Sequence, residues 1–331
     1  MPDQPDTRKS DDAVTDGDAF KRLWAKTKPY HPLWKHLMDT SAVSLALRPP
    51  LVRFGWNAEQ TALLVGLHDT GKADPVFQHQ EWRDADGNVQ SFSQELASVG
   101  FKSTRDARCR HERVSAEFLK ARLNELGMDL YTADSISRAV VAHHGYWYEG
   151  ARETTPVYEQ AREQLYDLLL DTLGVDSLPR DAPSDLSAFG MRLAGHVVLC
   201  DWIASNEEFI ADERLRNADD PEHYFAASRE VAREWIEALE LETDQDRGTP
   251  SEIVSAPRPI QQALLENDIP PGLVIIEAPM GEGKTEAAWI LAEKWRDAGY
   301  HGTYMALPTM ATSDSLYGRY KDDYLRKLGR M

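Results

Sequence analysis

Apolar residues in the first two thirds of the chain mostly follow a helical spacing. Residues 33–46 carry a loose apolar stripe, and Pro32 suits the first turn of that helix. Further helical segments are predicted at 61–67, 135–141, 157–173 and 186–205. The last of these is apolar almost all round, which predicts a buried helix. Residues 80–100 are polar and contain glycine, which predicts a loop or an insertion. The pattern predicts a mainly α-helical fold, a helical bundle, over residues 19–240.

The pattern changes in the last third of the chain. Residues 241–259 are polar and contain Gly and Pro, as a linker does. Residues 273–277 are a short, largely β-branched run, which predicts a strand. A glycine-containing loop at 278–285 and then a helix to about Trp295 are predicted to follow, with a second strand at 304–307. Residues 260–331 are therefore predicted to form the incomplete start of an α/β domain.

Composition and charge narrow the function classes. A length of 331 residues favours two domains, and no apolar run approaches the roughly 20 residues that span a bilayer. Residues 1–18 are acidic and lack the apolar core of a secretory signal, which predicts a disordered tail. Two cysteines form no disulfide framework, so we expect a cytoplasmic protein. A net charge of −18 argues against coating duplex nucleic acid, but not against a nuclease that contacts phosphates through metal ions.

The first candidate chemistry lies where an apolar helix ends. Residues 62–67 lead directly into His68 and Asp69. An ionised carboxylate buried with such a helix is costly unless it is paired or bound to a metal ion. A neutral imidazole beside a carboxylate can bind one cation. The alternative is a histidine packed in the core and an aspartate that caps the helix. A metal site is the better interpretation only if other segments of the chain supply further ligands.

Other histidines and an aspartate also occur at the ends or in the interiors of predicted helices. The complete candidate set is His36, His68, Asp69, His111, His143, His144 and Asp201. Imidazole and carboxylate together suit Mn, Fe, Co, Ni or Zn better than Ca. Seven ligands are too many for one catalytic ion, but they suit two ions about 3.5–4 Å apart that share a carboxylate. His196 is expected to be a hydrogen-bonded core residue instead.

This order of residues resembles the HD superfamily of metal-dependent phosphohydrolases. More narrowly, it resembles the HD nuclease domain of the CRISPR-associated helicase–nucleases of type I interference systems. The likeness is carried by segments 23–26, 36–39, 68–72, 111–112, 142–145 and 201–205. The resemblance implies a nuclease that cuts single-stranded DNA with two divalent transition-metal ions (Mn, Fe, Co or Ni, with Mg as an alternative).

The resemblance also implies roles for individual residues. The first ion would be held by His36, His68, Asp69 and Asp201. The second would be held by Asp69, His111, His143 and His144, so that Asp69 bridges the two ions. Lys72 would neutralise a phosphate oxygen during catalysis. The alternative for Lys72 is a surface salt bridge.

A second motif follows the predicted strand of the C-terminal part. Residues 278–285 (APMGEGKT) lie between strand and helix, which is the context of a phosphate-binding loop. Backbone N–H groups around Gly281 and Gly283 would cradle phosphates. Lys284 would reach the β- and γ-phosphates of ATP, and Thr285 would bind Mg²⁺. Alanine at the first position matches the form found in superfamily 2 helicases.

Two neighbouring segments resemble helicase motifs. Residues 258–261 resemble the motif that recognises adenine, with Gln261 a better candidate than Gln262. Residues 304–317 resemble motif Ia, which contacts the DNA backbone. No Walker B motif follows the phosphate-binding loop in this sequence. We therefore expect the N-terminal part of a longer 3′-to-5′ helicase, unable to hydrolyse ATP by itself.

A basic stretch is unusual in so acidic a chain. Residues 102–122 carry seven basic and three acidic side chains. The candidate DNA contacts are Arg105, Arg108, Arg110 and Arg113. A solvated helix face is the alternative.

Two other functions stay open at this stage. An HD phosphohydrolase of nucleotides or cyclic dinucleotides would share the metal ligands, but it would not precede a helicase motif. A metal-stabilised recruitment module would need no catalysis. For the nuclease, resemblance alone implies a monomer in the prokaryotic cytoplasm, recruited by an RNA-guided surveillance complex at an R-loop.

Overall fold

The chain folds into two compact units, residues 1–243 and 244–331. The computed structural model describes residues 17–84, 86–103, 110–144, 155–239, 250–297, 305–306 and 310–325. Each unit has its own hydrophobic core. Among the described residues, none of the helices combines the length and the apolar character needed to cross a membrane. Of the predicted acidic tail, only Gly17 and Asp18 are described.

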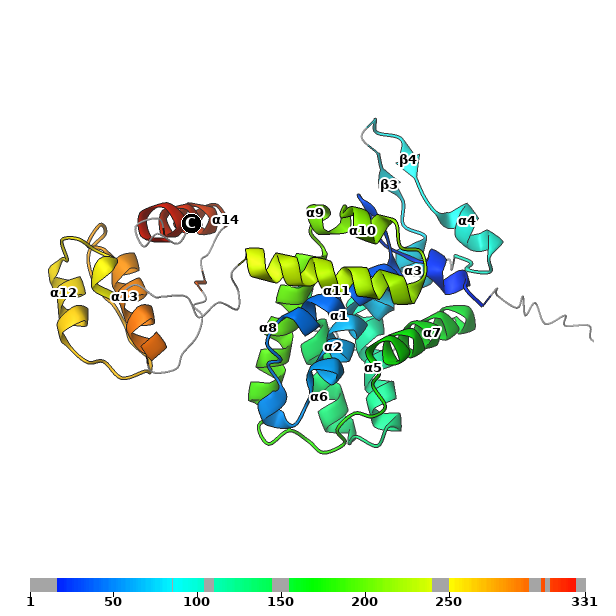
Figure 1. The fold of residues 1–331 in the computed structure, drawn as a ribbon, viewed down its shortest axis with the longest axis horizontal. Helices are drawn as coiled ribbons and strands as arrows, with labels where there is room; N and C mark the ends of the chain where they lie inside the picture. Colours follow the sequence, from blue (N-terminus) through cyan, green and yellow to red (C-terminus); the bar gives the residue numbers. More distant parts are fainter. Residues whose placement is uncertain are drawn as a thin grey trace, which may run out of the picture. The chain divides into compact units, whose positions relative to one another are not determined.

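The first unit is a helical bundle, which confirms the predicted mainly α-helical fold. Its longer helices are α1 (Leu33–Ala46), α2 (Ala58–Gly66), α5 (His111–Glu125), α6 (Leu130–Val141), α7 (Pro156–Leu173), α8 (Leu186–Ala204) and α11 (Pro221–Ala238). Four short helices are α3 (Pro75–Gln78), α4 (Ser93–Ser98), α9 (Glu207–Ile210) and α10 (Glu213–Arg216). Helix α1 packs against α2, α8 and α11 (Figure 1). Leu33, Leu37 and Val43 are fully buried, so the predicted apolar stripe faces the core.

Helix α2 begins earlier than the apolar run alone predicts. The Asn57 side chain accepts a hydrogen bond from the backbone N–H of Gln60, and the Gln60 side chain accepts one from the backbone N–H of Asn57. This reciprocal pair satisfies free N–H groups at the helix start. After Gly66 the chain tightens into a 3-10 helix, Leu67–Lys72, which carries the His-Asp pair.

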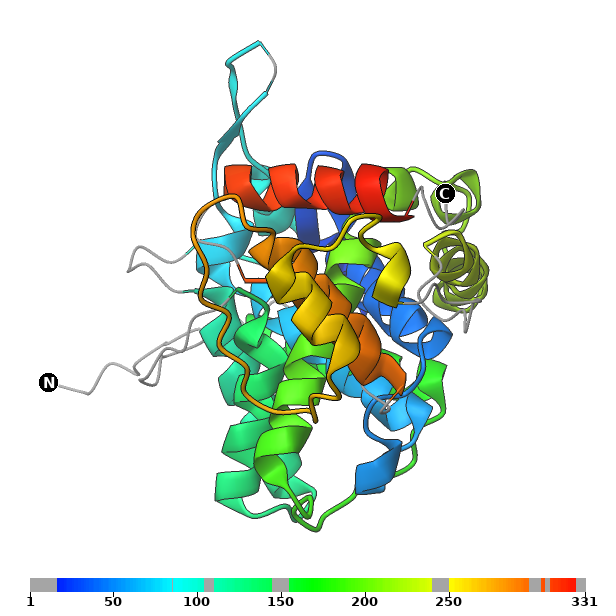
Figure 2. The same cartoon turned by 90° about the vertical axis from the view of Figure 1, so that its left-hand side faces the viewer.

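Two short hairpins accompany the helices. Strands β1 (Trp24–Thr27) and β2 (Tyr30–Pro32) pair antiparallel beside α1. Strands β3 (Trp82–Arg83) and β4 (Val89–Gln90) form an arm that projects from the bundle (Figures 1 and 2). The segment predicted as a loop at 80–100 thus contains a hairpin and α4. Trp82 and Phe92 pack against each other in this segment, with ring centroids 4.8 Å apart and ring planes tilted by 43°.

Helix α8 is only half buried, so the prediction of a buried helix is wrong for one of its sides. Phe189, Leu193 and Val197 are fully buried. Met191 and Trp202 are 78% and 70% exposed. Helix α8 packs against α1 and α6, and apolar composition alone did not reveal that the other side faces outward.

The second unit contains α12 (Pro259–Glu266), α13 (Lys284–Asp297), α14 (Met310–Arg319) and a π-helical turn, Tyr320–Leu325. Ile253, Leu264 and Ile290 are buried in its core. The strand predicted at 273–277 is not formed, and Leu273 is 91% exposed. A strand needs a neighbouring strand for its hydrogen bonds, and the described part of this unit offers none. Of the strand predicted at 304–307, residues 305 and 306 are described and form no strand, and residues 304 and 307 lie outside the described residues.

Candidate metal centre

Five segments of the first unit bring the seven predicted ligands together. His36 lies on α1 and Asp201 on α8, while His68 and Asp69 lie on the 3-10 helix after α2. His111 is the first residue of α5. His143 and His144 end the 3-10 helix that follows α6. The ligand atoms form two groups, each within 4.8 Å: His36, His68, Asp69 and Asp201, and His111, His143 and His144.

Two glycines allow these segments to approach so closely. A Cβ on Gly66 would lie 2.3 Å from Ser41 Oγ on α1. A Cβ on Gly71 would lie 2.0 Å from the carbonyl oxygen of His111 and 2.5 Å from Ser115 N. The Gly71 N–H also donates to Ser115 Oγ at 2.8 Å. The glycine after the His-Asp pair therefore permits the contact that places His111 near Asp69.

Asp69 lies between the two groups. Its Oδ2 is 3.1 Å from His36 Nε2 and 3.3 Å from His68 Nε2. Its Oδ1 faces the other way, 3.2 Å from His111 Nε2 and 3.4 Å from His143 Nε2. The side chain is almost fully buried. One carboxylate thus presents an oxygen to each group, which is the arrangement that a bridging ligand needs.

Asp201 completes the first group from the opposite side. Its Oδ1 is 3.6 Å from both His36 Nε2 and His68 Nε2. The same oxygen accepts a hydrogen bond from Ser205 Oγ at 2.8 Å, one helical turn further along α8. Ser205 therefore orients the carboxylate toward the imidazoles.

Several buried polar atoms of the centre have no hydrogen-bond partner in the described part of the chain. They are His36 Nδ1, His68 Nε2, Asp69 Oδ1, His111 Nε2, and both ring nitrogens of His143. Leaving such atoms unpaired is costly in a protein interior. His68 Nδ1 donates to the Val65 carbonyl oxygen at 2.8 Å, so in the neutral imidazole that binds a metal ion the lone pair is on Nε2, the atom that faces Asp69 and Asp201. These donors and their burial fit divalent transition-metal ions.

The electrostatics also favour a cation here. Burial lowers the pKa of His36 to about 3. Burial would lower that of His68 too, but Asp69 and Asp201 raise the pKa of His68 to about 10. Although burial favours the neutral acid, Lys72 and His68 hold the pKa of Asp69 well below its usual range. The buried Asp69 and the partly buried Asp201 thus need positive charge beside them, and a divalent ion would add to the charge of Lys72.

Comparison with known proteins agrees with this geometry. A sequence model of the family described as "Cas3, HD domain" matches residues 24–210. The chain belongs to this family. Within the Cas3 nuclease–helicase family, it is 31% identical to the "CRISPR-associated endonuclease/helicase Cas3" of Thermus thermophilus, over 94% of this chain and 36% of that protein. It is 27% identical to the "CRISPR-associated nuclease/helicase Cas3" of Streptococcus thermophilus, over 77% of this chain and 30% of that protein.

Solved structures show the same relationship. The structure described as T. fusca Cas3-AMPPNP aligns with a TM-score of 0.61 and 27% identity, over 93% of this chain and 37% of that one. A structure described as a CRISPR-associated protein aligns with a TM-score of 0.62 and 31% identity, over 95% of this chain and 38% of that one. The chain thus spans about a third of the length of the Cas3 relatives that it matches.

Lys72 is buried in this Cas3 HD domain. Its Nζ is 2.6 Å from Asp69 Oδ2, and the residue is 8% exposed. The surface salt bridge considered as an alternative is therefore wrong, because the pair is an interior one. Its contact with phosphate stays a prediction, as do the ligand roles of the seven residues.

The predicted nucleotide residues line one pocket of the second unit, about 670 Å³ in volume. The five are Gln261, Gly281, Gly283, Lys284 and Thr285. Gln261 is buried, accepts from the Arg258 N–H at 2.9 Å and donates to the Gly283 carbonyl oxygen at 3.1 Å. Lys284 Nζ donates to the carbonyl oxygens of Ala278 and Pro279. Gly281 and Gly283 have φ of 86° and 74°, which only glycine adopts readily.

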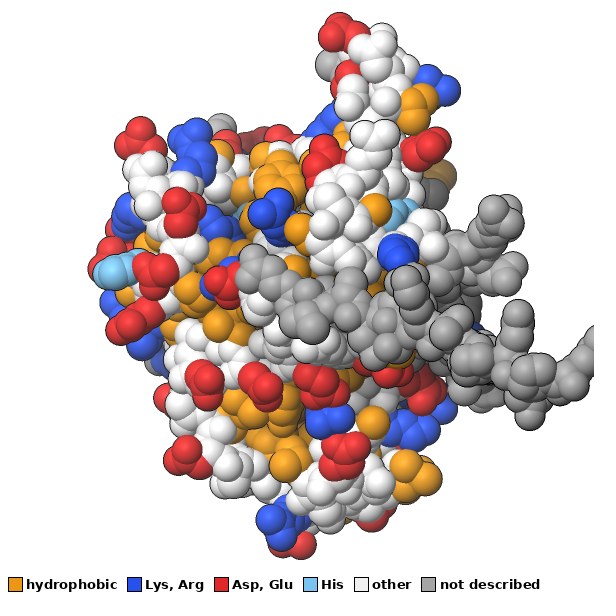
Figure 3. Space-filling view, turned by 90° about the vertical axis from the view of Figure 1, so that its right-hand side faces the viewer, with side chains coloured by type: hydrophobic (Ala, Val, Ile, Leu, Met, Phe, Trp, Pro, Cys, Tyr) orange, Lys and Arg blue, Asp and Glu red, His pale blue; other side chains and the backbone are white. Residues whose placement is uncertain are grey.

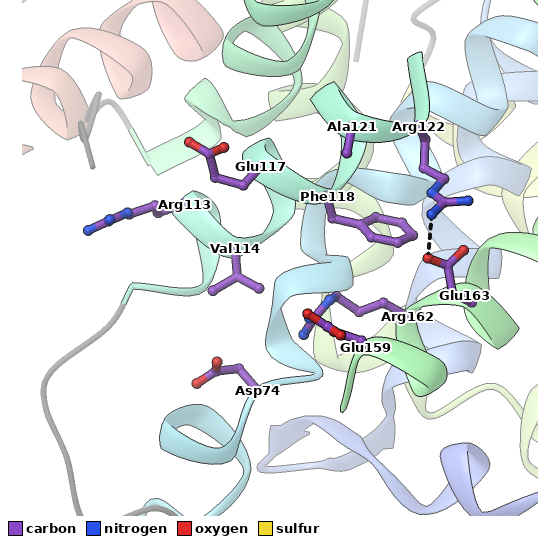
Figure 4. A pocket seen from close by; sticks show the side chains of 10 residues that line it. All are labelled: Asp74, Arg113, Val114, Glu117, Phe118, Ala121, Arg122, Glu159, Arg162 and Glu163. Atoms are coloured by element: carbon purple, nitrogen blue, oxygen red, sulfur yellow. Dashed lines mark ion pairs between the residues drawn. The ribbon is translucent and has the colours of Figure 1, made fainter. Parts of the chain in front are cut away.

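The basic stretch is only partly described. Arg105 and Arg108 lie outside the described residues. Arg110 precedes α5, and Arg113 lines a cleft of about 380 Å³ that also contains Asp74, Glu117, Glu159 and Glu163 (Figure 4). On the face drawn in Figure 3, Lys and Arg side chains are scattered among acidic ones. The surroundings of Arg113 are thus mixed in charge, and DNA contact by these arginines stays a prediction.

Two residues beside the centre had no predicted role. Ser205 was visible in the sequence one turn after Asp201, a spacing that places both on one face of α8. Lys26 precedes the turn between β1 and β2. In the sequence it lies in segment 23–26, which carries part of the family resemblance, but the sequence indicates no role for it.

Proposed function

We propose that residues 19–240 form a metal-dependent nuclease domain that cuts single-stranded DNA. The observation that carries this proposal is the position of Asp69, whose two oxygens face separate groups of imidazoles. Two-metal phosphodiesterase sites use a shared carboxylate of this kind. Membership in a family of nuclease–helicases supports the same chemistry.

The predicted ligands divide between two ions. One ion would take His36, His68, Asp69 and Asp201, and the other would take Asp69, His111, His143 and His144. Mn, Fe, Co or Ni suits this ligand set, with Mg as an alternative. When bound, such ions lower the pKa of water and neutralise charge that develops on a phosphodiester.

The chain's own residues would hold the reacting groups in place. Asp69 and Asp201 keep their ionised form beside the imidazoles, and Lys72 would bind a non-bridging phosphate oxygen. In the overall reaction the water oxygen forms a bond to phosphorus. The bond from phosphorus to one ester oxygen breaks, and that oxygen takes up a proton.

Residues 260–331 would begin an ATP-dependent helicase domain, and the linker before it would be shorter than the predicted 241–259, because Ile253 is buried in the core of the second unit. Gln261 would recognise adenine. Gly281, Gly283 and Lys284 would hold the phosphates, and Thr285 would bind Mg²⁺. In the longer protein, movement along one strand in the 3′-to-5′ direction would deliver DNA to the nuclease site.

Recruitment by an RNA-guided surveillance complex at an R-loop is part of the proposal. A structure described as a CRISPR RNA-guided surveillance complex, pre-nicking, contains a chain 25% identical to this one, with a TM-score of 0.55 over 91% of it. We expect the protein to act as a monomer in the prokaryotic cytoplasm.

The direct test is incubation with circular single-stranded DNA and Mn²⁺ or Ni²⁺. Cleavage that EDTA stops and that Asp69→Ala abolishes is the expected result. His223→Ala, which removes an exposed histidine outside the centre, should leave it unchanged. Hydrolysis of free nucleotides with intact DNA would show a phosphohydrolase instead. Cleavage that persists in a folded Asp69→Ala protein would refute the assigned site.

A further inference from the structure

A second lysine lies close to the candidate metal centre. Lys26 on β1 is partly buried, and its Nζ donates to the backbone carbonyl oxygen of Ser205 at 3.0 Å. Ser205 Oγ donates in turn to Asp201 Oδ1. Lys26 is therefore linked to a predicted metal ligand through one residue.

A buried amide connects the segments that carry Lys26 and Lys72. Gln78 Nε2 donates to the carbonyl oxygens of Trp24 and Lys72, each at 2.8 Å. Gln78 Oε1 accepts from the Trp24 N–H at 3.0 Å, and the Trp24 indole donates to the Gln78 carbonyl oxygen. Because Trp24 and Lys26 share β1, these bonds fix the strand that carries Lys26 relative to the 3-10 helix that carries Lys72.

The two ammonium groups differ in how their charge is balanced. Lys72 forms an ion pair with Asp69. Lys26 forms none in the described part of the chain, and its hydrogen-bond acceptor is a neutral carbonyl oxygen. Burial lowers the pKa of Lys26, and the charge of Lys72 lowers it further, while Asp201 and Asp69 raise it. A partly desolvated cation without an ion pair is suited to bind an anion.

We propose that Lys26 binds a backbone phosphate of the single strand beside the metal centre, with Gln78 setting its position relative to Lys72. This inference rests on the proposed nuclease function. The competing role is structural, because a lysine that donates to Ser205 O also caps the end of α8. The two roles differ in one respect: only phosphate binding depends on the charge of Lys26.

Lys28 provides a matched control. It follows Lys26 by two residues, is exposed, and donates to a backbone carbonyl oxygen, that of Arg83, at 2.8 Å. Lys26→Gln and Lys28→Gln each remove a charge but keep a side-chain donor. Binding of a short single strand with phosphorothioate linkages, which resist cleavage, would be measured by fluorescence anisotropy across a salt series.

We expect Lys26→Gln to weaken binding about fivefold to tenfold and to lower the slope of log K against log salt by about 0.7, the value for one single-strand phosphate contact. Lys28→Gln should leave the slope unchanged, and Lys26→Arg should restore it. Bound Mn²⁺ and the melting temperature should be the same in all variants. An unchanged slope for Lys26→Gln, or equal losses in both variants, would overturn the proposal.

Failure of the nuclease proposal would look different. If the unaltered protein does not cut circular single-stranded DNA with Mn²⁺, the nuclease function is wrong, whatever the salt slopes show. If it cuts while the slope of Lys26→Gln is unchanged, the nuclease function stands and only the role of Lys26 is refuted.

Discussion

Gly71 lies against the first turn of α5, where a Cβ would come within 2.0 Å of the His111 carbonyl oxygen. This contact joins the 3-10 helix of Asp69 to the helix that presents His111. Since the opposing atom is backbone, it cannot move aside as a flexible side chain could.

Gly71→Ala should therefore push α5 away from Asp69. We expect a loss of about 1–3 kcal/mol in the free energy of unfolding, as for other overpacked sites. We also expect weaker binding of metal by the group that contains His111, measured by titration with Mn²⁺.

Gly195→Ala is the control for this substitution. Gly195 lies within α8, and nothing lies within 4 Å of a Cβ placed there. Alanine at this position should be neutral or stabilise by up to about 1 kcal/mol, because glycine is a poor helix former. Equal stability of the two variants would show that α5 does not pack closely against Gly71.

Protonation of His196 should lower the free energy of unfolding in acid. His196 is buried and bonded to Ser44 Oγ at 2.9 Å, which confirms the predicted core histidine. Burial lowers the pKa of His196 to about 4, from the usual 6.5 of a histidine. The unfolded chain therefore binds the proton first, and stability is lost as the pH falls from about 6.5 through about 4, by about 3 kcal/mol in total.

His196→Gln should remove this part of the acid dependence, because glutamine does not titrate. Urea unfolding at neutral pH and near pH 4 would measure it. His223→Gln is the comparison, since His223 is fully exposed and its pKa is raised by Asp220. If His196→Gln loses as much stability in acid as the unaltered protein, His196 is not the group responsible.

The helical bundle and the ligand set were accessible from the sequence because polar residues interrupt apolar helices there. His68, Asp69 and Asp201 stand in segments whose other residues are mostly apolar, and burial makes such positions costly without a partner. Their division into two groups was implied by family resemblance. Periodicity gives no information on distances between helices, so the place of Asp69 between the groups needed the structure.

Other features depend on contacts that sequence patterns do not encode. The role of Gly71 depends on how α5 approaches, and the position of Lys26 depends on Gln78, which lies 52 positions further along the chain. The two sides of α8 are similarly apolar, yet Trp202 is exposed. The run at 273–277 has the composition of a strand, but a strand also requires a neighbour.

Substitution of Asp69 should weaken the binding of more ions than substitution of Asp201. Asp69 faces both groups, whereas Asp201 faces only His36 and His68. Asp69→Ala should weaken binding of both ions and Asp201→Ala of one. Removing a supporting residue of a metal site typically costs 10–100-fold in affinity, so loss of a ligand should cost at least about 100-fold.

Metal analysis after equilibration with limiting Mn²⁺ would measure these losses, with circular dichroism to confirm folding. Asp39→Asn is a useful comparison, because Asp39 is a buried carboxylate bonded to His31, Tyr224 and Ser228 rather than to the predicted ligands. Equal metal content in Asp69→Ala and Asp201→Ala would contradict a bridging role for Asp69.

Substitution of Arg110 and Arg113 would test whether the basic stretch contacts DNA. If each binds one phosphate of a single strand, replacing both by glutamine should lower the salt slope of binding by about 1.4. Arg122→Gln is the control, since Arg122 is paired with Glu125 and Glu163. An unchanged slope in the double variant would favour a solvated helix face.

Gln261 and Gln262 are neighbours with different surroundings. Gln261 is buried and its side chain is bonded to the Gly283 carbonyl oxygen, whereas the Gln262 side chain donates to Glu266 on its own helix. Gln261→Ala removes a side chain that fixes the phosphate-binding loop, so it should weaken nucleotide binding about tenfold, the equivalent of one hydrogen bond of about 1.4 kcal/mol.

Gln262→Ala should leave nucleotide affinity unchanged. A fluorescent ATP analogue would report binding, and a parallel titration with ADP would show whether the loss depends on the γ-phosphate. Because Gln261 holds the loop backbone and is also the predicted adenine contact, both nucleotides should lose affinity equally. A loss confined to ATP would indicate that the substitution acts on the γ-phosphate and not through the loop anchor.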